Sequence, residues 1–254
     1  MTMAEHRFHT PLPLTLDLNV PAGEIAVETV DGEESVVVLD GDERLVEQTR
    51  VELDGDRLVV SFRGRKPFGI TIAIGDFSFG TRPLQVRASV PHGAAASLST
   101  AAADMKVAGR IRELDVKSAS GELRVHGEIE GDTVLKTVSG DARIDRIGGD
   151  IRVQTVSGDV TVGSIGGSVE SKTISGDVRF ESVRQGYATF TSVSGDVEFG
   201  IAPGSFLDVD AGSVSGDLSS DVPLTSDPGE GGDGPTVILR GKTVSGDLKV
   251  FRSI

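Results

Sequence analysis

The sequence predicts an all-β protein: a single-stranded parallel β-solenoid (β-helix) with about 18–19 residues per coil, preceded by an N-terminal β-rich cap. The main observation is a phrase, usually apolar-Ser-Gly-Asp followed by an apolar residue, that occurs seven times. Its glycines are separated by 19, 18, 18, 19, 21 and 30 residues. They are Gly121, Gly140, Gly158, Gly176, Gly195, Gly216 and Gly246. Such a period is typical of stacked repeats, in which each repeat buries its apolar face against its neighbours.

A weaker copy of the phrase lies midway between successive glycines. Gly149 lies between Gly140 and Gly158, and Gly167 lies between Gly158 and Gly176. A strict period of 18 residues would also suit three faces of six residues each. The half-period near nine residues instead favours two comparable strands per coil and a flattened cross-section.

This register predicts two apolar columns inside the coils. The first is the residue before Ser-Gly, namely Val138, Val156, Ile174, Val193, Val214 and Val244. The second is the residue two positions after Gly, namely Ala142, Val160, Val178, Val197, Leu218 and Leu248. The last stretch, residues 237–250, is expected to add the final coil of the stack.

We place the cap or extension at residues 1–93 and the solenoid at residues 94–254, with a loop insertion at residues 221–235. In the cap, apolar residues alternate over residues 12–20, and Asp54-Gly55 between two apolar runs predicts a β-hairpin. Further alternating strands are expected at residues 70–74 and 84–90. No segment has convincing helical periodicity, so no helix is expected.

The composition restricts the classes of partner. The formal net charge is −14, and an acidic surface repels phosphate backbones and anionic headgroups, which argues against nucleic acid or a membrane as partner. There is no cysteine for disulfides or metal thiolates. Residues 1–10 contain no apolar run, so we expect a cytoplasmic protein without a signal peptide or membrane span. We also expect a monomer or small homo-oligomer with an unidentified protein partner.

An aspartate follows six of the seven glycines, which predicts a column of carboxylates. These residues are Asp141, Asp159, Asp177, Asp196, Asp217 and Asp247. Such a column could bind cations or polyhydroxy ligands. The structural alternative, which we favour, is that Gly supplies special backbone angles and Asp accepts hydrogen bonds from turn amides. The Gly-Gly-x-Gly-x-Asp repeat of calcium-binding rolls does not occur, so we expect no metal and no cofactor.

No set of residues predicts catalysis. The four histidines, His6, His9, His92 and His126, are scattered, and no acidic residue stands out as a general acid. The sequence has one tyrosine and no tryptophan, so few aromatic side chains are present that could stack against a sugar ring. The single basic cluster is a candidate docking site for an acidic partner and consists of Arg63, Arg65 and Lys66.

The chain resembles an uncharacterised bacterial family of β-strand-repeat proteins, a domain of unknown function whose members are labelled "putative adhesin". The resemblance rests on residues 11–27, on the Pro91-His92-Gly93 turn and on the Ser-Gly-Asp phrases, and it covers nearly the whole chain. It implies the solenoid fold and no established catalytic residues. We expect a non-enzymatic scaffold or interaction module. The alternatives are an adhesin-like or cell-envelope protein and, third, a carbohydrate-active enzyme.

Overall fold

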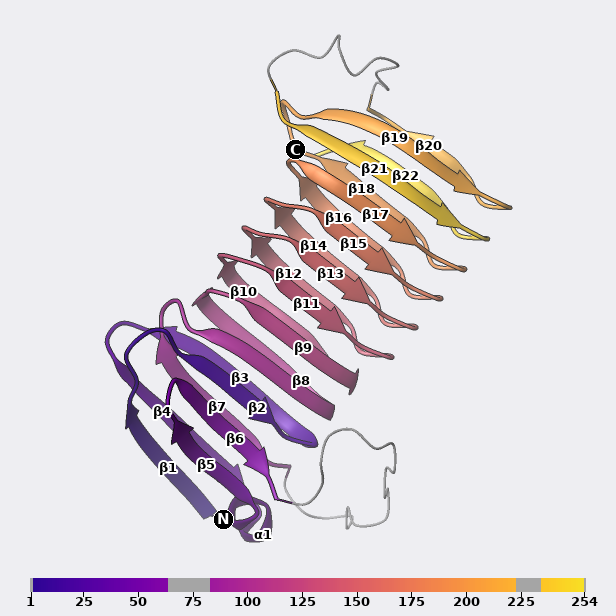
Figure 1. The fold of residues 1–254 in the computed structure, drawn as a ribbon. Coiled ribbons are helices and arrows are strands. Elements are labelled where there is room, and N and C mark those ends of the chain that lie inside the picture. The colour runs from indigo at the N-terminus through magenta and orange to yellow at the C-terminus, as the bar shows by residue number, and fades with distance from the viewer. Residues whose placement is uncertain (1, 64–82, 223–233, 254) are drawn as a thin grey trace.

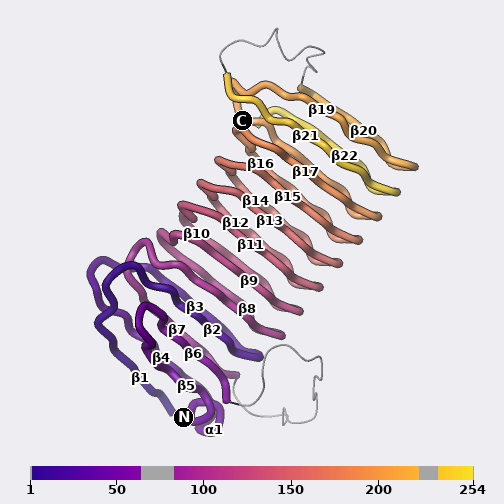
Figure 2. Tube along the Cα trace, viewed as in Figure 1, coloured from indigo at the N-terminus to yellow at the C-terminus, as the bar shows by residue number. Residues whose placement is uncertain are grey.

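The structure is a computed structural model that describes residues 2–63, 83–222 and 234–253. It confirms the all-β, solenoid-like prediction. Figure 1 shows one long stack of strands, with the N-terminal strands at one end and β19 and β20 at the other. The 22 strands of the described residues belong to one hydrogen-bonded network. The trace in Figure 2 follows successive coils that each contribute one strand to either side of the stack.

Each coil of the solenoid contributes one strand to each of two parallel faces, as the half-period predicts. In spatial order, face 1 contains β2 (Thr15–Asn19), the first half of β8 (Ala95–Ile111), β9 (Leu114–Ser120), β11 (Thr133–Lys136), β13 (Ile151–Gln154), β15 (Val169–Lys172), β17 (Gly186–Thr191), β21 (Thr236–Thr243) and β19 (Phe206–Ser213). Face 2 contains β3 (Ala22–Val30), the second half of β8, β10 (Leu123–Ile129), β12 (Ala142–Ile147), β14 (Val160–Ile165), β16 (Val178–Val183), β18 (Val197–Ile201), β22 (Leu248–Arg252) and β20 (Leu218–Ser220).

Antiparallel strands cover the N-terminal end of this stack. On face 1, β6 (Arg57–Phe62) pairs parallel with β2, and β5 (Thr49–Asp54) pairs antiparallel with β6. The hairpin expected at Asp54-Gly55 is present, with Gly55-Asp56 as its two-residue loop. On face 2, β7 (Gln85–Pro91) pairs with β3, followed by β4 (Glu34–Gly41) and β1 (Thr2–His9). Parallel pairing therefore continues past β2 and β3 to β6 and β7, and the antiparallel pairings involve the outer strands β1, β4 and β5. The strand expected at residues 70–74 lies outside the described residues.

The core is built from inward columns of equivalent residues. Ile144, Val162, Phe180 and Phe199 lie one above the other in register and are at most 1% exposed. The rings of Phe180 and Phe199 stack with their centroids 5.0 Å apart. Because each coil can bury this column only against its neighbours, the core extends the length of the stack.

One of the two predicted apolar columns lies inside. Ala142, Val160, Val178, Val197 and Leu248 are between 1% and 5% exposed, as expected. Leu218 is 49% exposed, contrary to the prediction, because β20 pairs only with β22 and forms the last strand of face 2. The other predicted column is wrong as a whole, because all six of its residues are exposed large hydrophobics.

The predicted order of the last coils is also wrong. The strands β21 and β22 lie between the coil of β17 and β18 and the coil of β19 and β20. The chain therefore leaves one coil position open, forms the last coil in space, and returns to fill the gap with its C-terminus. The inserted coil gains pairing partners on both sides, which satisfies its backbone groups more fully than a position at the end.

One short helix was not expected. Helix α1 (Glu43–Glu47) begins after Asp42, whose side chain accepts a hydrogen bond from the Arg44 amide. Five residues are too few to produce a periodic pattern, and the local signal is the N-cap aspartate followed by an acidic first turn.

The register predicts a sharp contrast between neighbouring residues of β14. We expect Val162→Asp to lower the free energy of unfolding by about 4 kcal/mol or more, because Val162 is 0% exposed and an aspartate there would be an unpaired buried charge. Thr161→Asp is the matched control, since Thr161 lies between Arg143 and Arg179 on the outer surface. It should change stability by less than about 0.5 kcal/mol. Urea denaturation of both variants measures the difference, and equal losses would contradict the register.

Candidate functional site

Each coil turns from face 1 to face 2 at a corner of five residues, Thr155–Asp159 in the coil that we describe. The Thr155 side chain points inward and is only 5% exposed. Its Oγ1 accepts a hydrogen bond from the Gly158 amide and donates one to the Gly158 carbonyl, both at 3.1 Å. The same inward hydroxyl occurs at Thr137, Thr173, Ser192 and Thr243. This residue therefore closes the turn from inside.

The serine and the glycine of the corner hold it against the coil before it. The Ser157 amide and hydroxyl both donate to the Val138 carbonyl, at 2.9 and 3.3 Å. A Cβ on Gly158 would overlap the carbonyl oxygen of Gly140. The expected reason for glycine, a special backbone angle, is wrong for six of the seven repeats, since only Gly121 has a positive φ, of 103°. Glycine is needed because two backbones approach closely.

The six aspartates form a continuous column in which every carboxylate but that of the last coil accepts a hydrogen bond from the next coil. The Oδ1 atom of Asp159 accepts a hydrogen bond from the Asp177 amide at 3.0 Å. The other links of the column, at 2.8–3.0 Å, join Asp141 to Asp159, Asp177 to Asp196, Asp196 to Asp247 and Asp247 to Asp217. The described residues contain no group of three or more His, Asp or Glu placed to hold a metal ion. The carboxylates act here as acceptors for backbone amides.

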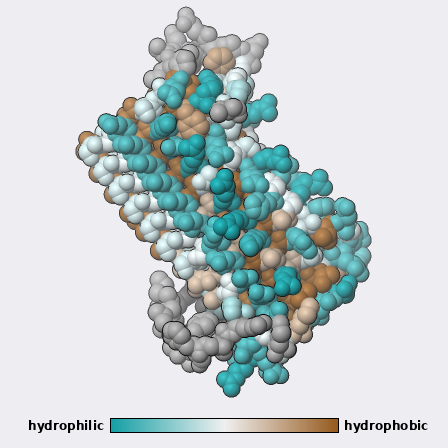
Figure 3. Space-filling model, turned by 180° about the vertical axis from the view of Figure 1, so that it is seen from behind, coloured by the Kyte–Doolittle hydropathy of each residue, from teal (hydrophilic) through white to brown (hydrophobic). Residues whose placement is uncertain are grey.

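The remaining corner residue, which we predicted to point inward, points outward instead. Val138, Val156, Ile174, Val193, Val244 and Val214 are 49%, 39%, 50%, 45%, 50% and 81% exposed. The reason is local: the preceding threonine or serine takes the inward position to close the turn, so the next side chain faces solvent. We call these six residues the corner ridge. Figure 3 shows hydrophobic residues recurring along one long edge of the solenoid.

Lysines flank the corner ridge on face 1. Lys136, Lys172 and Lys242 occupy the same position in their coils, two residues before the ridge. Between Lys136 and Lys172 stands the uncharged Gln154, where an open groove of about 450 Å³ lies beside Val156 and Ile174. Lys172 Nζ also binds Glu170 at 2.7 Å. Hydrogen bonds from Lys172 and then Arg152 lower the pKa of the Glu170 carboxyl.

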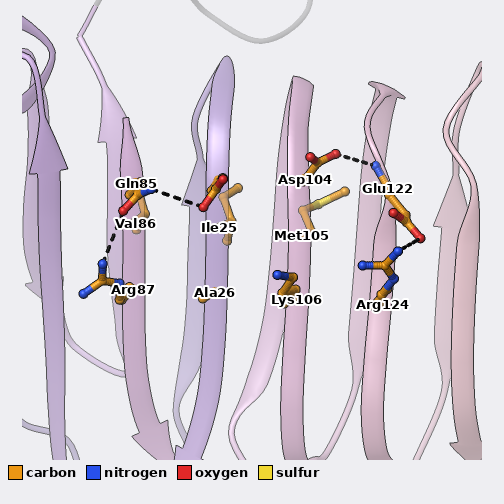
Figure 4. Close-up of a pocket in the computed structure, with 11 residues that line it drawn as sticks. Ile25, Ala26, Gln85, Val86, Arg87, Asp104, Met105, Lys106, Glu122 and Arg124 are labelled. Atoms are coloured by element: carbon orange, nitrogen blue, oxygen red, sulfur yellow. Dashed lines mark hydrogen bonds and ion pairs between the residues drawn. The ribbon is translucent and has the colours of Figure 1, made fainter. Parts of the chain in front are cut away.

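A second hollow of about 290 Å³ lies on face 2 near the cap, across β7, β3, β8 and β10. Figure 4 shows its charged and amide side chains in two rows. The first row holds Glu24, Gln85, Asp104 and Glu122, and the second holds Arg87, Lys106 and Arg124, with the small Ala26 between Arg87 and Lys106. We call this hollow the face-2 pocket.

Hydrogen bonds order the rim of the face-2 pocket. Gln85 donates to Glu24 at 3.3 Å and accepts from Arg87 at 3.2 Å. Arg124 lies 2.7 Å from Glu122. Negatively charged hydrogen-bond acceptors and positively charged donors therefore line the same hollow. This arrangement suits a ligand rich in hydroxyl groups.

The predicted docking cluster is only partly described. Arg63 is exposed, and its amide donates to the Gln48 carbonyl, whereas Arg65 and Lys66 lie outside the described residues. The histidines remain apart: His92 binds Thr29, at 2.6 Å, and His126 lies 3.5 Å from Asp145. Elsewhere on face 1, the guanidinium of Arg240 donates hydrogen bonds to the Asp208 carboxylate, which raises the pKa of Arg240. Among the described residues, no helix is long and apolar enough to cross a membrane.

Sequence reasoning missed the corner ridge and the face-2 pocket. A signal for the ridge was present, because an apolar residue recurs inside a phrase whose other members are polar or glycine. The pocket had no comparable signal, since it depends on the pairing of β3 with β7, whose residues are 61 positions apart.

Comparisons with known proteins agree with this fold. A family model described as "Putative auto-transporter adhesin, head GIN domain" matches residues 20–181, and one described as "Toastrack DUF4097" matches residues 149–250. A search of the curated proteins finds no matching sequence.

Two solved structures from Parabacteroides distasonis resemble the chain. One, a "Putative lipid binding protein", has a TM-score of 0.60 and 14% identity over 98% of this chain and 96% of that chain. The other, a "putative adhesin", has a TM-score of 0.51 and 13% identity over 98% and 97% of the two chains. At these identities the likeness concerns the fold alone.

The corner geometry predicts that Gly158→Ala is strongly destabilising. The added Cβ meets rigid backbone of Gly140, so the coils must separate, which should lower the free energy of unfolding by about 3 kcal/mol. Gly212→Ala on β19 is the control, because no atom lies within 4 Å of a Cβ there. Thermal and urea denaturation should leave the control within about 0.5 kcal/mol of the parent. A mild effect of Gly158→Ala would mean that the coils are not held this closely.

The aspartate column predicts different outcomes for two substitutions at one position. Asp159→Ala removes the acceptor of the Asp177 amide and should cost about 1 kcal/mol of stability. Asp159→Asn keeps an acceptor oxygen and removes one charge from a column of like charges, so it should be neutral within about 0.5 kcal/mol or stabilising. Melting temperatures of the two variants test this, and an equal loss in both would show that the charge itself is required.

Proposed function

We propose that this chain, which belongs to the family described as "Putative auto-transporter adhesin, head GIN domain", is an adhesin-like protein of the cell envelope that binds its ligand without catalysis. The family description favours this function, one of our alternatives, over a general intracellular scaffold. For the same reason we propose an exported, cell-surface location in place of the cytoplasmic one. We keep residues 1–93 as the proposed cap and residues 94–254 as the proposed solenoid.

The observation that carries the proposal is the face-2 pocket. Its carboxylates and cations project from hydrogen-bonded strands, and the contacts of Gln85 with Glu24 and of Arg124 with Glu122 order its rim before a ligand arrives. Preorganised polar groups reduce the ordering cost of binding. Carboxylate, amide and guanidinium groups together suit a hydroxyl-rich ligand, and we propose a surface glycan as the ligand class.

A non-catalytic role agrees with how the acidic residues are used. The repeated aspartates are engaged with backbone amides, and the pKa of Glu170, which shifts downward, is set by ordinary surface ion pairs. No general acid or nucleophile is apparent among the described residues of the face-2 pocket, whose rim carboxylates Glu24 and Glu122 are bound to Gln85 and Arg124. A carbohydrate-active enzyme therefore has less support than a carbohydrate-binding protein.

The test is to fill the pocket without disturbing the sheet. Ala26→Tyr should block the hollow between Arg87 and Lys106 and abolish binding to a glycan that the parent captures on a glycan array. Thr161→Tyr is the matched control, since Thr161 lies further along the same outward row, beyond Arg124 and Arg143. It should bind as the parent does. Equal binding by all three proteins, or no captured glycan at all, would overturn the proposal.

A further inference from the structure

The corner ridge is the one part of the repeated corner that the fold does not explain. In the coil of residues 155–159, the threonine, serine, glycine and aspartate each contact the backbone of their own or a neighbouring coil. The apolar residue takes part only through its backbone, whose carbonyl accepts from the serine of the next coil, and its side chain is exposed. Six such residues at about 4.8 Å spacing form a strip of about 24 Å, an exposed apolar patch of the kind that marks an interaction surface.

The two sides of the ridge carry opposite charges. On face 1 it is flanked by Lys136, Lys172 and Lys242, all exposed. On face 2 it is flanked by the aspartate column, from Asp141 to Asp217. Every ridge coil therefore has an anion on one side, and three of the six also have a lysine on the other. A partner must offer an apolar strip with the charges reversed.

We propose that the partner is a second copy of this chain, which docks ridge to ridge with the two solenoids parallel. A two-fold axis along the solenoid exchanges the two sides of the ridge, so the lysines of each copy face the aspartates of the other. A two-fold axis perpendicular to the solenoid would make the ridges antiparallel and place lysines opposite lysines. Charge complementarity thus selects the parallel arrangement.

The repeat spacing supports the same partner. A second copy has an identical rise per coil, so each apolar residue meets its own equivalent, and the match persists over all six coils. The strip is narrow, and an interface of this length falls at the small end of specific interfaces, where association is weak and reversible. This self-association uses the edge of the solenoid and leaves the face-2 pocket free.

Sedimentation velocity over a range of protein concentrations tests the dimer. The parent is expected to show a concentration-dependent dimer that Ile174→Asp abolishes, because the two-fold axis brings the two new carboxylates together. Met3→Asp is the control at an exposed apolar residue of β1, 63% exposed against 50% for Ile174, and should dimerise as the parent does. Since both sites face solvent, both variants should fold.

Charge reversal tests the flanks of the ridge. Lys136→Glu combined with Lys242→Glu should weaken the dimer, since it places carboxylates against the partner's aspartates. Arg7→Glu combined with Arg50→Glu changes the net charge equally on the exposed surface of β1 and β5, away from the ridge, and should leave the dimer unchanged. Equal weakening by both pairs would indicate a net-charge effect and would overturn the charge argument.

Disulfide trapping tests the direction, because the chain contains no cysteine. Val138→Cys and Val244→Cys lie near opposite ends of the ridge, and a disulfide requires Cα atoms about 4.4–6.8 Å apart. The parallel dimer predicts that each variant, alone, forms a covalent dimer on oxidation, whereas Met3→Cys does not. Failure of both end variants, including the case in which only Ile174→Cys cross-links, would overturn the parallel dimer. Glycan binding is measured separately, so either proposal can fail without the other.

Discussion

The stack depends on the close approach of each corner glycine to the backbone of the equivalent residue in a neighbouring coil, which is another glycine for all but Gly121. The Cβ of any other residue at Gly140, Gly158 or Gly176 would overlap a carbonyl oxygen that the parallel hydrogen bonds hold in place. This contact fixes the spacing between coils at the turn, and the other corner residues follow from it. The threonine fills the space beneath the glycine, and the serine and aspartate bind the coils on either side. Equivalent residues are therefore aligned in columns, whatever their chemistry.

Alignment in columns explains both the strengths and the errors of prediction from the sequence. The period, the two faces and the Ala142 column follow from spacing alone, because each depends on a residue and its nearest equivalents. The direction of Val138 and Val156 could not be obtained from alternation, since the corner breaks the alternation when Thr137 or Thr155 turns inward to bind an amide. The position of β21 and β22 in the stack could not be obtained from their order along the chain. Whether their coil lies inside the stack or at its end, each coil packs against another coil with the same repeat pattern.

The candidate sites differ in the same way. The aspartates were visible as a repeated pattern, and their role in binding amides follows from their position after glycine. The face-2 pocket arises from Ala26, a single small residue in an outward row that otherwise holds Arg87, Lys106 and Arg124. Because the row is assembled from the four strands β7, β3, β8 and β10, its hollow has no signature in local sequence. A binding site of this kind belongs to the stack rather than to any repeat.

The inserted C-terminal coil has a consequence for the corner ridge. It places Lys242, Val244 and Asp247 between the coil of Val193 and the coil of Val214. The coils on either side carry the uncharged Thr191 and Gly212 at the lysine position, so the inserted coil supplies the cation at that position toward this end of the ridge. The cationic flank thereby extends along the ridge from Lys136 to Lys242 instead of ending at Lys172. Insertion of the last coil, which satisfies backbone pairing, also completes the charge pattern on which parallel docking of two copies depends.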